Sequence, residues 1–149
     1  MSVVVRTIAR ILIPVILVFG GYVILHGHLT PGGGFQGGAV AASAVALLLV
    51  AVGAPAVKKL KAPFSVLEDL GGVAFVVLGF LGIGFTFFAN SLAGMGGLFG
   101  APVPSGPNPG VLNTAGTVPL MNWAVGLKVL GGLGAVLVLF GLFGGDDDR

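Results

Sequence analysis

Long apolar runs dominate the chain, and short segments rich in glycine, proline or charge separate them. The apolar positions do not show the ~3.6-residue period of an amphipathic helix, in which one face packs on a protein core and the other faces water. Runs of about 20 apolar residues are typical of helices that cross the ~30 Å hydrocarbon core of a bilayer. The pattern predicts four membrane-spanning helices at about residues 7–28, 38–57, 66–89 and 120–143, with a Gly/Pro-rich loop at 90–119.

Composition supports the same interpretation. Only 8% of the residues are charged and 56% are hydrophobic, and the mean hydropathy is +1.10. A water-soluble domain normally carries about 25% charged residues. We therefore expect residues 1–149 to form a single all-α domain, a multi-pass bundle of four transmembrane helices in the cell membrane.

The positions of the basic residues predict the orientation of the bundle. Basic residues are concentrated in the terminal segments and between the second and third predicted helices: Arg6, Arg10, Lys58, Lys59, Lys61 and Arg149. The positive-inside rule then places both termini in the cytoplasm. With a net charge of only +2 we expect no nucleic-acid partner, and the absence of cysteine excludes thiol and disulfide chemistry.

The segment HGHLTPGGGFQGG, residues 26–38, joins the first two predicted helices. It has neither the preceding strand nor the Gly-Lys-Ser/Thr ending of a phosphate-binding loop. Proline and glycine favour a sharp turn instead, and we assign that turn to Pro31, Gly32, Gly33 and Gly34. Gly37 and Gly38, each four residues before an alanine, predict close packing of the second helix.

His26 and His28 are the only histidines in the chain. Two residues subtend about 200° around a helix, so both side chains face one site only where the helix has unwound. We expect no metal site, because no third histidine, cysteine or nearby carboxylate completes a ligand set. A proton-handling role and a polar packing role both remain open.

Lys128 is the one charged residue within the fourth predicted helix. A lysine inside a span costs ~2.5–3.5 kcal/mol on insertion scales and usually faces a partner or a water-filled cavity. Snorkelling toward the interface marked by Trp123 is the alternative. By depth we expect Lys128 to match His26 and His28, and not to pair with acidic residues at the opposite face.

Two acidic residues stand near the start of the third predicted helix. Ser65-Val66-Leu67-Glu68 fits a capping box, in which Glu68 bonds back to the amide of Ser65. Asp69 points elsewhere. It either stabilises the positive end of the helix or contributes charge to a cytoplasmic half-channel.

Three segments together resemble a known family. GHLTPGGGFQGG, EDLGG and GTVPLMNWAVGLKVLGG are similar to segments of the B subunit of multisubunit Mrp-type Na+/H+ antiporters, the MnhB/MrpB family. Related subunits occur in membrane-bound, energy-converting hydrogenase and sulfur-reducing complexes. The sequence does not decide between an antiporter and a respiratory complex as the host.

The resemblance implies a small non-catalytic subunit without a cofactor, in the lipid bilayer beside other antiporter-module subunits. In a respiratory host, a hydrogenase-like redox arm would be a further partner. Na+ and H+ would be the transported ions. The candidate residues of the ion path are Lys128, His26, His28, Asp69 and Glu68.

Three hypotheses of function follow. The subunit helps form an ion path around Lys128, or it is purely structural and uses its small-residue faces, at Gly37 and Gly38, as the interface with partners. The third is a freestanding oligomeric channel. We expect no enzymatic activity, because no nucleophile–base pair and no paired carboxylate site is visible in the sequence.

Overall fold

The computed structural model describes residues 2–82, 84–103, 105–106 and 111–144, which form helices and loops with no strand among them. The elements are α1 (Val3–His26), α2 (Gly34–Val52), α3 (Ala54–Lys58), α4 (Lys61–Phe80), the 3-10 helix η1 (Leu112–Thr114) and α5 (Val118–Phe143). Four of them, α1, α2, α4 and α5, are long and apolar enough to cross a membrane. The prediction of an all-α, multi-pass membrane protein is confirmed.

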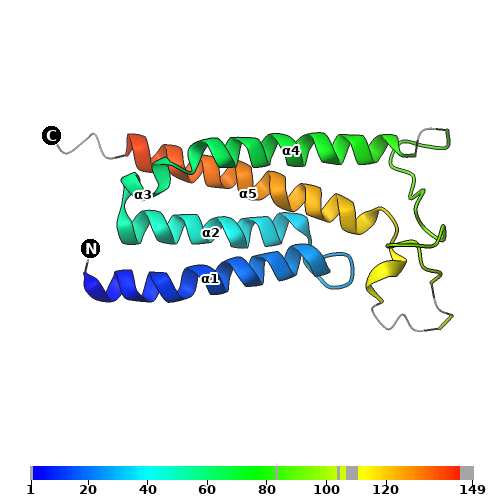
Figure 1. The fold of residues 1–149 in the computed structure, drawn as a ribbon, viewed down its shortest axis with the longest axis horizontal. Helices are drawn as coiled ribbons and strands as arrows, with labels where there is room; N and C mark the ends of the chain where they lie inside the picture. Colours follow the sequence, from blue (N-terminus) through cyan, green and yellow to red (C-terminus); the bar gives the residue numbers. More distant parts are fainter. Residues whose placement is uncertain (1, 83, 104, 107–110, 145–149) are drawn as a thin grey trace.

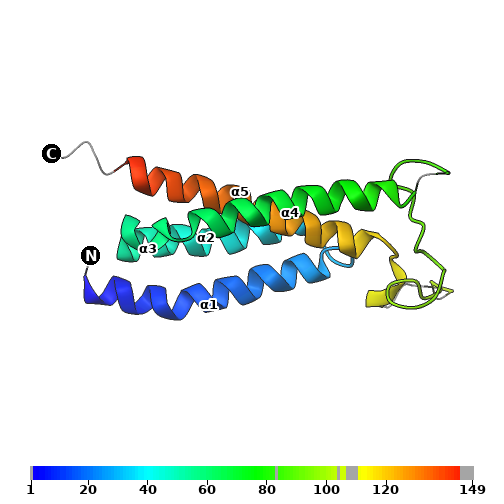
Figure 2. The ribbon, with the colours of Figure 1, turned by 45° about the horizontal axis from the view of Figure 1, so that its top comes forward.

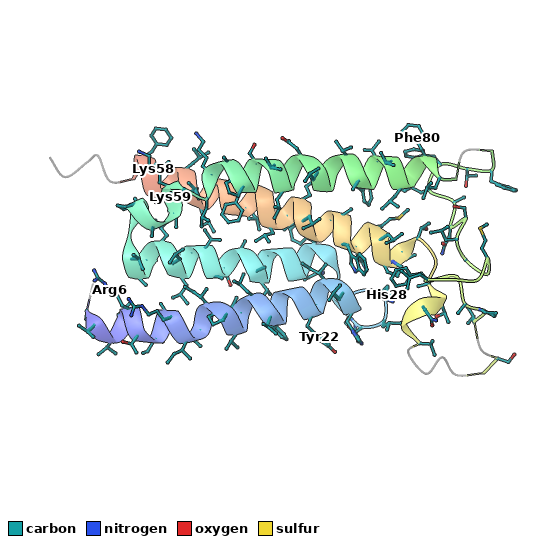
Figure 3. The ribbon with its side chains drawn as sticks, viewed as in Figure 1. Arg6, Tyr22, His28, Lys58, Lys59 and Phe80 are labelled. Atoms are coloured by element: carbon teal, nitrogen blue, oxygen red, sulfur yellow. The ribbon has the colours of Figure 1, made fainter. Side chains whose placement is uncertain are left out.

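The long helices lie side by side, and the start of α1 and the end of α5 are at the same end of the bundle (Figure 1). We call this the terminal end, and the opposite end, covered by the described residues of 81–117, the loop end. Arg6, Lys58 and Lys59 all lie at the terminal end (Figure 3), whereas Arg149 lies outside the described residues. Placement of the terminal end in the cytoplasm stays a prediction.

The helices form a row in the order α1, α2, α5, α4, because the extensive contacts join α1 to α2, α2 to α5, and α5 to α4. Figures 1 and 2 show α5 running obliquely along α4, so that the two cross near the middle of the bundle. The helices α1 and α4 therefore occupy the two edges of the row.

Small residues bring the helix backbones close together within this chain. A Cβ atom added to Gly37 would lie 2.7 Å from the carbonyl oxygen of Gly20 in α1. On the other face of α2, a Cβ atom on Gly38 would lie 2.8 Å from the carbonyl oxygen of Gly126 in α5. Contrary to our expectation for a partner interface, both glycines are buried against the chain's own helices.

The helix ends differ from those that hydropathy predicts. Helix α1 covers 3–26 rather than 7–28, and α5 begins at Val118, two residues early. Helix α2 begins at Gly34 and ends at Val52, before Gly53, whose φ of 100° interrupts the helix and leaves 54–58 as the separate α3. These shifts reflect backbone geometry, which hydropathy does not measure.

Helix α4 differs most from the prediction. It begins at Lys61 rather than Val66 and ends at Phe80 rather than Ala89. Pro63 is compatible with the early start, because the first turn of a helix needs no amide donor. Ser65 thus lies inside the helix and is not its N-cap, so the predicted capping box is wrong.

The loop end is tied to the start of α5 by one side chain. Asn90 Oδ1 accepts hydrogen bonds from Thr117 N (2.8 Å) and Thr117 Oγ1 (3.0 Å), and Asn90 Nδ2 donates to the carbonyl of Ala115 (3.1 Å). Phe99 packs edge-on against Trp123 of α5, with ring centroids 5.6 Å apart. The segment between α4 and α5 is therefore anchored to the bundle at these points.

Candidate functional site

An ion pair joins the two helices at the α4 edge of the row. Lys128 Nζ of α5 lies 3.4 Å from Glu68 Oε1 of α4. Lys128 is ten residues after the start of α5, ~15 Å along the helix axis, and Glu68 is seven residues after the start of α4, ~10 Å along it. The pair therefore lies inside the membrane-spanning part of both helices.

This pairing corrects the sequence-based expectation that Lys128 would lie near the histidines and away from Glu68. The expectation counted depth from apolar runs that begin at Val66 and Leu120. Both helices begin earlier, so each charged residue lies deeper than expected. Because the helices run in opposite directions, the added depth on each brings the two side chains to one level.

Glycines on each helix allow the close approach of the charged residue on the other helix. A Cβ atom on Gly71 would lie 2.5 Å from Lys128 N, and one on Gly131 would lie 2.5 Å from Glu68 N. The next glycine on each helix makes room for a side chain. The Lys128 chain lies across Gly72, and the Glu68 carboxylate lies over Gly132, at distances of 3.5 to 3.7 Å from an added Cβ atom.

The sequence contains the same spacing on both helices. Residues 68–72 are EDLGG and residues 128–132 are KVLGG, so a charged residue precedes a Gly-Gly pair by the same spacing on each helix. In an antiparallel pair, each charge then reaches the glycines of the other helix. This shared spacing is the signal that would have predicted the ion pair from the sequence.

A groove of about 650 Å³ opens beside the ion pair. Apolar side chains and glycines of α4 and α5, with Phe35 of α2, form most of its lining, and Glu68 and Lys128 supply its charged groups. The Lys128 side chain is 53% exposed and that of Glu68 is 40% exposed. Two charged groups at membrane depth therefore remain open to whatever covers this face.

The other acidic candidate does not join this arrangement in the described part of the chain. Asp69 is exposed, one position further along α4, and the described residues give it no ion pair. It lies nine residues after Leu60, the N-cap residue of α4. It is thus well beyond the first turn, where the positive helix end would stabilise it.

The histidines lie at the loop end of α1. His26 is the last residue of α1, and its ring stacks on Tyr22 with centroids 4.8 Å apart. His28 follows in the turn and is half-buried. Figure 3 shows it near the loop end. Among the described residues no three His, Cys, Asp or Glu side chains come together as a metal site.

The glycine-rich segment serves as the turn between α1 and α2. Gly32 and Gly33 have φ angles of 147° and 149°, which favour glycine. Gly34 then packs against the backbone of Asn122 and Gly126 in α5. The segment thus seats the start of α2 on α5.

Comparison with known proteins gives consistent results. Residues 4–135 match the family described as a domain related to the MnhB subunit of Na+/H+ antiporters. The chain is 39% identical over 121 residues to an uncharacterized protein of Methanocaldococcus jannaschii, an alignment that covers 78% of this chain and 43% of that protein.

A second relative carries a functional name. The chain is 37% identical over 73 residues to the Staphylococcus aureus (strain Newman) protein named "Putative antiporter subunit mnhB2". That alignment covers 48% of this chain and 52% of the relative. The chain thus spans about half the length of the curated relatives it matches.

Proposed function

The chain belongs to the family of proteins related to the MnhB subunit of Na+/H+ antiporters, and on this premise we propose that it helps form the ion path of a multisubunit antiporter. Its partners would be the other membrane subunits of that antiporter. The observation that carries the proposal is the Glu68–Lys128 ion pair, which lies in the membrane-spanning part of α4 and α5 and is open on one side.

The energetics favour a functional role for the pair. A charged side chain at the centre of a span is costly, and such residues usually line ion or proton pathways. Within this chain both side chains stay partly exposed, so each can also contact a transported cation or a neighbouring subunit.

In this role the two groups would act together. Glu68 would bind the transported Na+ or H+ transiently, and Lys128 would lower the carboxylate's affinity for either cation so that it is released. Movement of the ammonium group toward or away from Glu68 would then couple binding to release. The chain contributes charge and position, and any redox step would belong to a hydrogenase-like arm if the host is a respiratory complex.

The test is ion exchange by the whole complex, reconstituted in vesicles after each variant complex has been shown to retain every subunit. We expect Glu68→Gln and Lys128→Met each to lower the initial rate of Na+/H+ exchange on the order of tenfold or more, a barrier increase of about 1.4 kcal/mol. Asp69→Asn is the matched control, because it removes a neighbouring carboxylate outside the pair, and it should leave the rate unchanged.

A purely structural role for the same pair makes a different prediction. The double variant Glu68→Lys with Lys128→Glu keeps the ion pair but exchanges its ends. If the pair only joins α4 to α5, this variant should assemble and exchange ions at the normal rate. Normal assembly with impaired exchange is the result expected from an ion path.

A further inference from the structure

The groove beside the ion pair is about two helical turns long. Its lining extends from Glu68 to Val76 on α4 and from Val125 to Leu133 on α5, which is ~12 Å along each helix. Gly72 and Gly132 contribute no side chains to its floor. These dimensions suit a short stretch of another helix that packs against α4 and α5.

The charged groups in this groove have unused hydrogen-bonding capacity. An ammonium group has three donors, and in the described part of the chain Lys128 Nζ makes one hydrogen bond, to Glu68. Lys128 is also the more exposed member of the pair, at 53% against 40%. The unmet requirement on this face is therefore mainly for an acceptor opposite the ammonium group.

We propose that the groove binds a membrane-spanning helix of another subunit, which fills it with apolar side chains and presents an acidic side chain to Lys128. The proposal rests on the proposed membership in a multisubunit antiporter but not on ion conduction by the pair. A carboxylate is the acceptor that matches an ammonium group best in a low-dielectric surrounding, because it supplies an opposite charge as well as hydrogen-bond acceptors.

Lipid alone does not supply a hydrogen-bond acceptor opposite the Lys128 ammonium group. Acyl chains have no acceptor, and phosphate groups lie at the interfaces, whereas Lys128 is ~15 Å from the start of α5 and ~22 Å from its end. The lysine chain also lies across Gly72 toward Glu68 instead of extending along the helix toward an interface. The geometry thus favours a protein partner at this depth.

Site-directed photo-crosslinking in the purified complex tests the proposal. A benzophenone amino acid would replace Val76 on α4 or Leu133 on α5, which line the groove and are 49% and 40% exposed. Val77 is the matched control, because it is 55% exposed but does not line the groove. Mass spectrometry would then identify the crosslinked residue.

We expect both groove variants to crosslink to one membrane-spanning helix of another subunit, within two turns of an Asp or Glu, and the Val77 variant not to reach that position. Crosslinks only to lipid, to a second copy of this chain, or to a helix without a nearby acidic residue would overturn the proposal. None of these results depends on ion exchange. The partner helix can therefore be disproved while the ion path stands, and the ion path can be disproved while the partner helix stands.

A charge-balance experiment checks the acidic residue itself. Lys128→Met should loosen the identified subunit, so that less of it remains with the complex after detergent washing. Neutralising the partner's acidic residue to its amide in the same complex should restore retention, because the unpaired carboxylate is removed. Equal retention in the Lys128→Met complex and the unmodified complex would contradict a bond between the two.

Discussion

Two neighbouring glycines on α4 have different packing environments. A Cβ atom on Gly71 would lie 2.5 Å from Lys128 N and 2.6 Å from the carbonyl oxygen of Ala124, both of them backbone atoms that cannot move aside. A Cβ atom on Gly72 would meet only the flexible Lys128 side chain, at 3.7 Å. The first glycine permits the helix contact, and the second leaves room beside the ion pair.

We therefore expect Gly71→Ala to destabilise the folded subunit by about 1–3 kcal/mol, the usual cost of overpacking a close contact. Gly72→Ala should change stability little, because its new methyl group makes an ordinary contact. Thermal unfolding of the purified complex in detergent, followed through this subunit, measures both. A loss of stability at Gly72 as large as that at Gly71 would show that the α4–α5 contact is closer than the structure places it.

At the residue scale, the sequence predicted which charged residues matter but not which of them pair with each other. Lys128 and Glu68 were both recognisable, because charged residues are rare in apolar spans. Their pairing depended on where α4 and α5 begin, and an error of a few residues in each start shifts a side chain by a turn. Sequence-based depth is therefore too coarse to match one residue to another across two helices.

At the element scale, the start of α5 depends on a side chain outside the helix. Its N-cap residue, Thr117, is 1% exposed and makes no capping bond with its own side chain to the helix. Asn90 instead accepts from the amide and the hydroxyl of Thr117. These two bonds connect the segment after α4 directly to the first turn of α5.

Asn90→Ala would leave a buried amide and hydroxyl without their acceptor, which costs about 1–3 kcal/mol. We expect amide hydrogen exchange at the start of α5 to become faster, on the order of tenfold, while exchange in the middle of α5 is unchanged. Ser91→Ala is the control, since no hydrogen bond of its side chain is seen in the described residues. Unchanged exchange in Asn90→Ala would mean that water replaces the asparagine at no cost.

Helix number and helix ends were predictable to different degrees. The four spans follow from apolar length, because a hydrocarbon core admits only helices long enough to cross it. The ends follow from backbone geometry. The apolar residues after Gly82 extend the hydropathy of α4 toward Ala89, yet the helix stops at Phe80 and the chain reaches a positive φ of 114° at Gly84.

At the scale of the whole molecule, the row of helices leaves large apolar faces uncovered. Many exposed side chains are Val, Leu, Ile and Phe, on α1 as well as on α4 and α5. Such a surface requires lipid or other membrane subunits around it. The order of the row was not predictable, because small residues suited to close packing occur on each of the four long helices.

The orientation of this row in the membrane can be tested directly, because the chain contains no cysteine. Ser2 is exposed at the terminal end and Ser105 is exposed in the loop region, so Ser2→Cys and Ser105→Cys each introduce a single reactive thiol. The positive-inside rule predicts that a membrane-impermeant maleimide added to intact cells labels Ser105→Cys and not Ser2→Cys. Both variants should react after the membrane is permeabilised. Labelling of Ser2→Cys in intact cells would show that the orientation is the reverse of the predicted one. The terminal end, where α4 begins seven residues before Glu68, would then face the outside of the cell.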